Sequence, residues 1–363
     1  MINILIAGAG QIGSTIAHLL SSLRDYQIFL VDSNLSPVSP YIQKCKHIHL
    51  EKQNVTQLKD LQAFVHHHKI HGVVSCLPYF LNKNIADLAH NTHIHYFDLT
   101  EDIDVSNYVR KLAENSSSAF VNQCGLAPGF VNIIANDLMR HFDELDSVRI
   151  RCGGLPKTSI NELKYAFTWS VDGLINEYNR PCPAIEDGQF VFLTPLGNLE
   201  NIQIDGLNYE AFNTSGGLGS LTESYKGKIK TLNYKSMRYP GHCEKMRFLM
   251  QDLKLGKDVE TLKRILLKVI PHTTEDVVIM YISVIGNIKN KLERKSFVNK
   301  YYGCTIDGID YSALQLTTAC SASTIVNTVM QQPEKYHGHV QQEQFNFSDI
   351  TNGPFGHYLK DTR

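Results

Sequence analysis

The sequence lacks an excess of charge of either sign, and it lacks long apolar runs. Its 35 lysines and arginines nearly balance its 36 acidic residues, so the formal net charge is -1. This balance gives no long-range attraction to nucleic acid or to an anionic membrane, and neither partner is expected. No apolar stretch reaches the roughly 20 residues that a membrane span requires. The composition, 43% hydrophobic and 20% charged, is that of an ordinary soluble globular protein. Because a polyanionic partner is not expected, a small-molecule substrate fits better.

The sequence also lacks a regular cysteine or histidine pattern. Its eight cysteines are scattered without a C-x-x-C pair, which predicts free thiols in a reducing compartment. The pairs His47/His49 and His93/His95 have no third ligand nearby, and the histidine run 66–68 ends a helical pattern, so no metal site is predicted. Because the N-terminus has no basic region followed by a cleavage site, we expect a cytoplasmic protein.

The first positive signal is GAGQIG, residues 8–13. An apolar run at residues 2–6 precedes it, as in a strand buried on both faces. Apolar residues at helical spacing follow it as far as residue 23. The glycines therefore lie between a strand and a helix, where a dinucleotide-binding turn requires them, although an ordinary tight turn is the alternative. The predicted cofactor contacts in this turn are Gly8, Gly10, Gln11, Ile12 and Gly13.

The three glycines and a later aspartate divide the work of binding a dinucleotide. Gly8 permits the tight bend, Gly10 lets the backbone approach the pyrophosphate, and Gly13 lets helix and strand pack closely. The helix N-terminus adds N–H donors and the positive end of its dipole. Asp32 ends the next buried strand, about 20 residues after the glycines, where a carboxylate hydrogen-bonds the adenosine ribose.

Asp32 also bears on the choice of cofactor. A carboxylate at this position repels the 2'-phosphate of NADP, and no arginine follows it in DSNLSP, so NAD is predicted. The alternative is that Asp32 only caps a loop. A methyltransferase could carry the same glycine turn and acidic strand end, so the fingerprint alone does not establish a dehydrogenase.

Helices and strands alternate through the first third of the chain. This alternation predicts a doubly wound parallel sheet, compatible with six strands. Ligands bind beyond the carboxyl ends of such strands, which makes Ser75 and Cys76 further predicted cofactor contacts. The predicted elements after the second strand are a helix at 55–67, a strand at 72–76, a helix at 81–90, a strand at 94–99, a helix at 105–114 and a strand at 119–121.

After Gly125 the regular alternation stops, and the pattern predicts an α+β domain built on a largely antiparallel sheet. Turn signals at 186–189 and at Gly286-Asn287 separate some of its strands. The predicted strands are 147–152, 164–170, 190–193, 228–238, 277–285 and 295–302, with helices at 243–254, 259–269 and 312–330. We therefore expect a NAD-binding Rossmann domain at 1–124, a substrate and dimerisation domain at 125–311, and a segment at 312–363 that returns to the first domain.

Several motifs resemble those of the saccharopine dehydrogenase (L-glutamate-forming) family. They are CGGLP at 152–156, NELKYAFTWS at 161–170, and GLAPG at 125–129, where Ala127 replaces an aspartate of the family's GLDPG. Within this family the chain is most similar to the bacterial L-lysine 6-dehydrogenase branch, through APG at 127–129, FNTSGG at 212–217 and RYPGHCEK at 238–245.

The resemblance implies NAD-linked oxidation of L-lysine at the ε-amine. The product would be allysine, which cyclises to piperideine-6-carboxylate. Saccharopine and carboxylated polyamines are the alternative substrates, and the loss of the aspartate at Ala127 favours lysine over saccharopine. A non-catalytic dinucleotide-binding protein is a second alternative. The resemblance also implies a homodimer.

His242 and Arg238 are the main candidates for the chemistry. His242 follows a Pro-Gly turn, and histidine side chains ordinarily titrate near neutral pH, which suits acid/base work, although this ring could instead pack or cap the following helix. Arg238 offers a bidentate fork for the substrate carboxylate, and a surface salt bridge is its alternative role.

The remaining site candidates come from the resemblance and from local pattern. Tyr79 and Cys152 match active-site positions of saccharopine dehydrogenases, which implies a substrate-binding role for Tyr79 and a catalytic one for Cys152. Cys152 could equally be a small apolar residue against the sheet. Thr214 begins a loop rich in donors for a carboxylate, and Asn132 could contact the substrate or only cap a helix.

Overall fold

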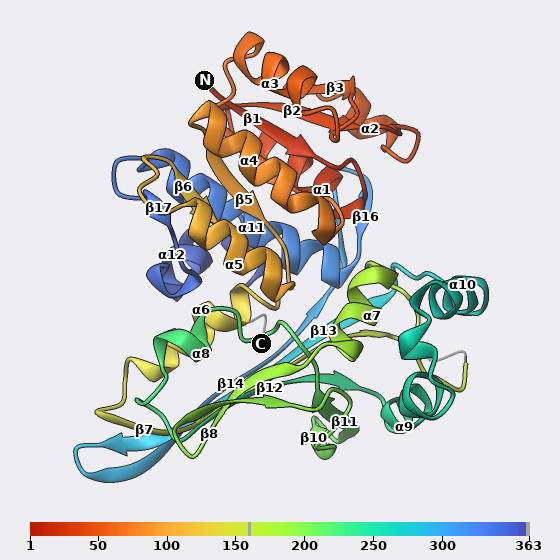
Figure 1. The fold of residues 1–363 in the computed structure, drawn as a ribbon, viewed down its shortest axis with the longest axis vertical. Coiled ribbons are helices and arrows are strands. Elements are labelled where there is room, and N and C mark those ends of the chain that lie inside the picture. The colour runs from red at the N-terminus through yellow and green to blue at the C-terminus, as the bar shows by residue number, and fades with distance from the viewer. Residues whose placement is uncertain (159–160, 361–363) are drawn as a thin grey trace. The chain divides into compact units, whose positions relative to one another are not determined.

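The chain folds into two compact units (Figure 1). The structure is a computed structural model that describes residues 1–158 and 161–360. Unit 1 contains Met1–Phe130 together with the C-terminal segment from Gln315, and unit 2 contains Val131–Leu314. The last three positions of the predicted segment 312–363 lie outside the described residues.

Unit 1 is built on a parallel sheet of seven strands, which confirms the predicted doubly wound fold. Every strand pair is parallel, and the strand order is β17-β6-β5-β4-β1-β2-β3. The order reverses between β1 and β4, and ligands of such sheets bind at that reversal. The strands are β1 (Ile2–Ala7), β2 (Tyr26–Asp32), β3 (Ile48–Lys52), β4 (Gly72–Ser75), β5 (His95–Asp98), β6 (Ala119–Val121) and β17 (Gly338–His339).

The first third of the chain supplies six strands, β1 to β6, as its alternation predicts, and the C-terminal segment adds a seventh. β17 pairs in parallel with β6, with Gly338 opposite Ala119 and His339 opposite Phe120. A strand of two residues carries no apolar alternation, so its sequence gives no signal. Its position is held by the backbone N–H of Gly338, which donates to the carbonyls of Ser116 and Ser118.

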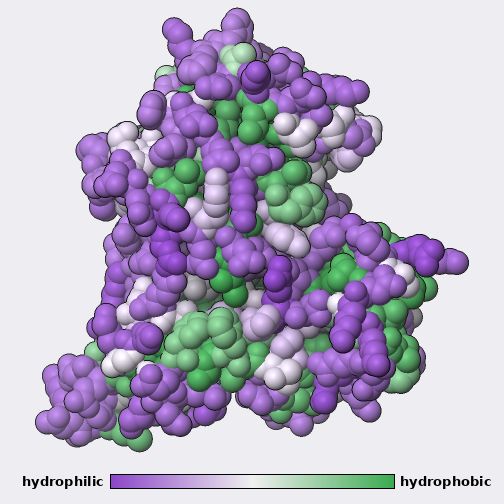
Figure 2. Space-filling model, in the orientation of Figure 1, coloured by the Kyte–Doolittle hydropathy of each residue, from purple (hydrophilic) through white to green (hydrophobic). Residues whose placement is uncertain are grey.

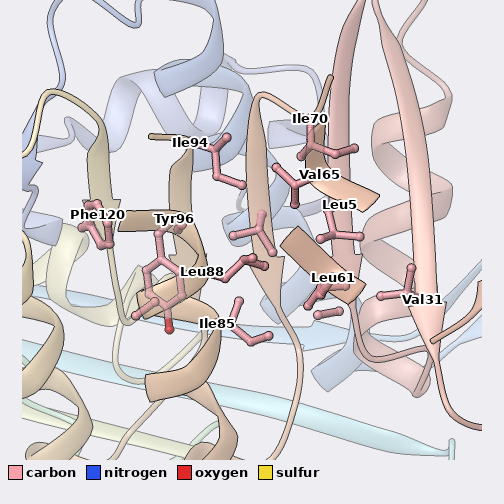
Figure 3. Packing of buried hydrophobic residues seen from close by; sticks show 14 of the residues in the cluster. Leu5, Val31, Leu61, Val65, Ile70, Ile85, Leu88, Ile94, Tyr96 and Phe120 are labelled. Atoms are coloured by element: carbon pink, nitrogen blue, oxygen red, sulfur yellow. The ribbon is translucent and has the colours of Figure 1, made fainter. Parts of the chain in front are cut away.

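Helices cover both faces of the sheet in unit 1. Figure 3 shows Leu61 of α3 and Ile85 and Leu88 of α4 packed against strand residues such as Leu5 and Tyr96. On the other face the hydroxyl of Tyr26 donates to Asn327 of α11 at 3.0 Å. The helices of unit 1 are α1 (Gln11–Ser21), α2 (Pro40–Gln43), α3 (Leu58–His67), α4 (Asn82–Thr92), α5 (Ile103–Leu112), α11 (Ala313–Gln331) and α12 (Phe347–Asn352).

Unit 2 is built on a mixed, mainly antiparallel sheet. The main strand order is β10-β11-β12-β7-β13-β14, and β8, itself paired with β9, adds to β12. Among the described strands of this second sheet, only β7 and β12 run parallel to each other. The strands are β7 (Glu144–Pro156), β8 (Cys182–Glu186), β9 (Gln189–Leu193), β10 (Glu200–Ile204), β11 (Leu207–Asn213), β12 (Thr231–Arg238), β13 (Asp276–Ile288) and β14 (Lys291–Tyr302). A further small pair joins β15 (Cys304–Ile306) and β16 (Ile309–Tyr311).

One of the two predicted turns is confirmed and the other was wrong. Asp187 and Gly188 have positive φ and join β8 to β9, as a two-residue hairpin loop requires. Gly286 lies inside β13 at a register shift, where a Cβ would come within 2.2 Å of the carbonyl oxygen of Glu144. Gly286 therefore permits a close strand approach, and Lys289 and Asn290 form the turn instead.

The strand predicted at 164–170 is not present. Tyr165 and Phe167 alternate as in a strand, but both side chains enter an aromatic and aliphatic core beside helix α7. Among the described residues, the backbone of Phe167 bonds to Pro271 and Thr273 without a strand ladder, so the segment is an extended loop. It ends at Ser170, whose hydroxyl caps α7 by accepting from the backbone N–H of Gly173.

In the sequence of unit 2, α6 precedes the first strand and the other helices come between strands. The helix predicted at 243–254 is shorter, because α9 ends at Arg247 and residues 248–252 continue as a wider turn. The helices are α6 (Phe130–Met139), α7 (Val171–Asn179), α8 (Leu221–Ser224), α9 (His242–Arg247) and α10 (Val259–Val269). Figure 2 shows mostly hydrophilic side chains on the face in view, with separate apolar areas between them.

Candidate functional site

The glycine turn in unit 1 is shaped for a ligand that needs close backbone approach. Gly8 has a φ of +107°, and a Cβ there would lie 2.8 Å from the carbonyl oxygen of Cys76. A Cβ on Gly13 would lie 1.9 Å from the carbonyl oxygen of Gly8. A Cβ on Gly10 would meet nothing within 4 Å. Protein packing thus explains Gly8 and Gly13, whereas Gly10 faces open space that a pyrophosphate would occupy.

The N-terminus of α1 supplies donors at the same turn. The helix begins at Gln11, and its N-cap residue, Gly10, has no side chain that could bond the first N–H groups. An anion can be bound by such N–H groups, as at other helix N-termini. The turn therefore fits a dinucleotide pyrophosphate.

Asp32 lies against the glycine turn, as its spacing in the sequence predicts. One carboxylate oxygen accepts from the backbone N–H of Ala9 at 2.8 Å, and the other accepts from that of Asn34 at 2.9 Å. The oxygen that accepts from Asn34 also accepts from the Ser33 hydroxyl at 3.3 Å, whereas the oxygen that faces Ala9 keeps a lone pair for a ribose hydroxyl. Lys52 on β3 is the register partner of Asp32.

Ser75 and Cys76 lie at the end of β4, beside the glycine turn. The Ser75 hydroxyl is buried and donates to the side chain of Asn82 at 2.7 Å. The backbone N–H of Cys76 donates to Ala7 at 2.8 Å. Burial raises the pKa of the Cys76 thiol to about 12, so this side chain stays neutral and packs against the turn.

Two carboxyl groups at the end of β5 titrate close to neutral pH. Burial raises the pKa of Asp98 to about 6, against hydrogen bonds from the Tyr96 hydroxyl and from the backbone of Gln123 and Thr100. Burial also raises the pKa of Glu101 to about 7, helped by the charges of Asp102 and Asp98. Both groups lie at the carboxyl edge of the sheet, the edge at which ligands of parallel sheets bind.

Tyr79, a predicted substrate contact, lies in unit 1 in the short 3-10 turn Tyr79–Leu81. Its half-buried ring packs partly on the core of unit 1 and meets the ring of Phe80 edge to face at 5.7 Å.

Arg238 is the centre of a buried polar cluster in unit 2. Its side chain is 4% exposed, with Nε donating to the Tyr178 hydroxyl at 3.0 Å and Nη1 donating to the Met237 carbonyl at 2.7 Å. The guanidinium lies over the rings of Tyr165 and Tyr178. Burial works against the charge of Arg238, but these two tyrosines and Glu177 raise its pKa above the usual value. The structure therefore holds a rigid cation, not a surface salt bridge.

His242 is fully buried and both of its ring nitrogens are used. Nδ1 lies 2.9 Å from the carbonyl oxygen of Leu163, and Nε2 lies 3.1 Å from the hydroxyl of Tyr178. Because a carbonyl only accepts, Nδ1 carries the proton and Nε2 accepts from Tyr178. Burial and the positive charge of Arg238 lower the pKa of His242 to about 3. We infer that His242, as a neutral ring, positions Tyr178 and through it Arg238, a role that differs from both the acid/base and the helix-capping alternatives.

Cys152 and Thr214 lie in the same region of unit 2. Cys152 is 3% exposed, and burial raises the pKa of its thiol to about 12, which favours packing over nucleophilic or proton-transfer chemistry. Its register partner on β12 is Ser236, whose hydroxyl shares a 2.8 Å hydrogen bond with that of Thr214. Thr214 is thereby fixed against the sheet at the start of the donor-rich loop.

Asn132 lies in α6 and is buried. Its side-chain amide donates to the carbonyls of Gly217 and Leu218 at 3.2 and 2.8 Å. These bonds hold the end of the loop that begins at Thr214, so we infer a positioning role for Asn132.

Sequence reasoning missed two buried carboxylates of this cluster. Glu177 precedes Tyr178 on α7 and contributes negative charge near Arg238. Glu210 on β11 is the register partner of Arg238 on β12. Its carboxylate accepts from the backbone N–H groups of Gly241 and Cys243 at 2.7 and 2.5 Å. Glu210 thus fixes the turn that carries His242. The available signal was an acidic residue within the apolar strand YEAF.

Two family models cover most of the chain. Residues 4–121 match the model described as saccharopine dehydrogenase NADP binding domain, and residues 125–361 match saccharopine dehydrogenase C-terminal domain. The chain belongs to the saccharopine dehydrogenase family. Members of this family include dehydrogenases, and residues 4–121 of this chain match their dinucleotide-binding domain.

Curated relatives and a solved structure agree with this family. Alpha-aminoadipic semialdehyde synthase of Mus musculus is 24% identical over 254 residues, which are 66% of this chain and 27% of that protein. Saccharopine dehydrogenase (NADP+, L-glutamate-forming) of Schizosaccharomyces pombe is 24% identical over 206 residues, 53% of this chain and 43% of that protein. The chain thus spans less than half of the length of these relatives.

The fold of this family member matches a solved relative over nearly its whole length. Saccharopine dehydrogenase (L-Glu forming) from Saccharomyces cerevisiae superposes with a TM-score of 0.77 and 15% identity, covering 97% of this chain and 96% of that chain. Among residues 1–158 and 161–360, no helix is long and apolar enough to cross a membrane. Within the same ranges, no three histidine, cysteine or acidic side chains gather as a metal site requires.

The buried neutral state of His242 predicts how stability depends on pH. A folded-state pKa of about 3 lies below the ordinary value, so the unfolded chain takes up a proton that the folded protein refuses. This contribution to stability is complete above pH 6.5 and is lost as the pH falls toward 3. From pH 7 to pH 5 it should lower the free energy of unfolding by about 2 kcal/mol. Denaturant unfolding of the wild type and of His242→Gln at several pH values measures this loss of stability. If the free energy of unfolding fell equally with pH in both proteins, the prediction would be contradicted.

Proposed function

We propose that this protein uses NAD to oxidise the ε-amine of L-lysine. The product is allysine, which cyclises to piperideine-6-carboxylate, and ammonia is released. The observation that carries this proposal is the buried, hydrogen-bonded guanidinium of Arg238 in unit 2. A fixed cation with its charge retained suits a substrate carboxylate. Ala127, where the family motif has aspartate, favours lysine over saccharopine.

The residues of the chain divide this chemistry between binding and proton transfer. Arg238 holds the carboxylate, while Tyr178 and His242 hold Arg238. The substrate amine must lose a proton before its lone pair can assist loss of hydride from the adjacent carbon. A group whose pKa lies near the working pH is suited to accept that proton. Bound NAD supplies the hydride acceptor. Water then adds to the substrate imine, and ammonia leaves.

Saccharopine is the second candidate substrate, because the Schizosaccharomyces pombe relative is named for it. The test follows NADH absorbance with L-lysine, saccharopine and carboxynorspermidine in turn, and measures ammonia and glutamate. Lysine turnover with ammonia release supports the proposal. Saccharopine turnover with glutamate release supports the second candidate. Tight NADH binding without oxidation of any of these amines would favour a non-catalytic dinucleotide-binding protein.

We propose NAD over NADP on the strength of Asp32. Its carboxylate is fixed at the glycine turn, where a 2'-phosphate would approach another negative charge. Two such charges about 4 Å apart repel by about 4 kcal/mol at a protein surface. We therefore expect kcat/KM for NAD to exceed that for NADP by at least about 100-fold. Asp32→Asn keeps an acceptor for the backbone N–H of Ala9 but removes the charge, so it should lower the ratio of kcat/KM for NAD to that for NADP. A wild-type enzyme that prefers NADP would contradict this assignment.

We also propose a homodimer that forms through unit 2. The large apolar side chains exposed on its strands and the adjoining loops support an interface there, since such residues mark contact surfaces when they gather. They are Phe192, Leu199, Leu207, Leu292 and Tyr302. Light scattering in solution measures the mass, and a particle of 41.0 kDa would contradict the proposal.

A further inference from the structure

Thr168 carries a buried hydroxyl that has no hydrogen-bond partner among the described residues. Its side chain is 4% exposed, and Oγ1 is buried from solvent. A buried hydroxyl without a partner destabilises the folded state, because it has given up its bonds to water. Such a group is a mark of a ligand that supplies the missing bond.

The position of Thr168 is fixed on both sides. The backbone of Phe167 donates to Pro271 at 2.8 Å and accepts from Thr273 at 3.0 Å. Two residues later Ser170 caps α7, the helix of Glu177 and Tyr178. The Thr168 hydroxyl is therefore presented by rigid backbone and cannot turn to solvent by loop motion alone.

The absence of a side chain on Gly154 leaves room for one carbon atom beside the Thr168 hydroxyl. A Cβ on Gly154 would lie 3.6 Å from the Thr168 hydroxyl and 3.6 Å from the Leu314 side chain, which is ordinary contact. Gly153, its neighbour, could not accept a Cβ, since that atom would lie 2.3 Å from the carbonyl oxygen of Met237. Close packing with β12 therefore requires glycine at position 153. At position 154 a Cβ would fit beside the Thr168 hydroxyl, so protein packing does not require glycine there.

The sheet register brings this space to Arg238. Cys152 on β7 pairs in parallel with Ser236 on β12. Two residues further along each strand, on the same face of the sheet, are Gly154 and Arg238. The unsatisfied hydroxyl and the fixed guanidinium therefore border the same end of the sheet.

We propose that the Thr168 hydroxyl donates a hydrogen bond to the substrate carboxylate that Arg238 binds, and so selects for amines that carry a carboxylate. This inference rests on the proposed function, because it takes the ligand of Arg238 to be the carboxylate of an amino acid. A carboxylate has lone pairs for both donors, and a bond from a hydroxyl to a charged oxygen is stronger than one between neutral groups.

The test compares Thr168→Val, Thr168→Ser and Gly154→Ala with the wild type. Loss of a hydrogen bond to a charged group predicts a KM for L-lysine about 10- to 100-fold higher in Thr168→Val, with kcat within a few-fold. Thr168→Ser keeps the hydroxyl and should restore KM to near the wild-type value. Gly154→Ala fills the space and should raise KM without loss of folding. Thr324→Val is the matched control, because the Thr324 hydroxyl is buried but donates to the Cys320 carbonyl, and its KM should not change.

Thermal stability separates a substrate contact from a structural one. Valine removes an unpaired buried hydroxyl at nearly constant volume, so Thr168→Val should have an unchanged or higher Tm while its KM rises. An unchanged KM, or a raised KM accompanied by a lowered Tm, overturns the inference.

If the wild type oxidises no amine, the proposed function fails, and calorimetry with L-lysine on the NADH-loaded protein still decides the role of Thr168. Binding at least tenfold weaker in Thr168→Val supports the inference. Equal affinities, or no binding by the wild type, overturn it.

Discussion

Arg238→Lys is expected to lower kcat/KM for L-lysine by about 100- to 1,000-fold, within the range for truncating a buried charge pair. Lysine keeps the charge but loses the Nε–H that bonds to Tyr178 and the planar fork that meets a carboxylate. Steady-state kinetics measure the change, with circular dichroism and NADH affinity as checks on folding. Cadaverine has no carboxylate, so with this substrate the kcat/KM of the wild type should be close to that of Arg238→Lys.

Arg151→Lys is the matched control for this result. Arg151 is another buried arginine of the same sheet, but it follows Ile150 and precedes Cys152, so it projects from the face opposite to Cys152. There it bonds to Glu200 and Asn233. Its replacement should lower stability and leave KM for L-lysine unchanged. An Arg238→Lys enzyme with wild-type KM would refute the carboxylate role of Arg238.

Gly10→Ala and Gly13→Ala should separate cofactor binding from folding. The new Cβ at position 10 meets no protein atom within 4 Å, so the Tm should not change. It does occupy the approach to the pyrophosphate, and overpacking of that kind should weaken NADH binding by about 10- to 100-fold.

At position 13 the Cβ would lie 1.9 Å from the Gly8 carbonyl oxygen, so strand and helix must separate. This variant should lose about 1–3 kcal/mol of stability as well as cofactor affinity. Fluorescence titration with NADH and calorimetric melting measure the pair. Wild-type NADH affinity in Gly10→Ala, or a wild-type Tm in Gly13→Ala, would contradict this account of the turn.

Local signals made the glycine turn predictable from the sequence. The turn, the strand before it and the helix after it are contiguous, and the packing of Gly13 against Gly8 follows from that short segment. Asp32 requires only the next strand. The carboxyl-edge position of Ser75 and Cys76 follows from the regular alternation of strands and helices.

Long-range partners explain what the sequence did not predict. Gly286 was interpreted as a turn because its close neighbour, Glu144, is far away in the chain. The parallel pairing of β7 with β12 joins strands separated by two hairpins, and no local pattern specifies it. The burial of His242 likewise depends on Tyr178, 64 residues away, so its pattern could not distinguish an acid/base role from a positioning role.

The most direct test of the central claim is to follow the hydride itself. L-lysine deuterated at the ε-carbon should yield NADH that carries one deuterium, detected by mass spectrometry, while L-lysine deuterated only at the α-carbon should yield unlabelled NADH. Deuterium delivered from the α-carbon, or no label from the ε-carbon during turnover, would contradict oxidation at the ε-amine.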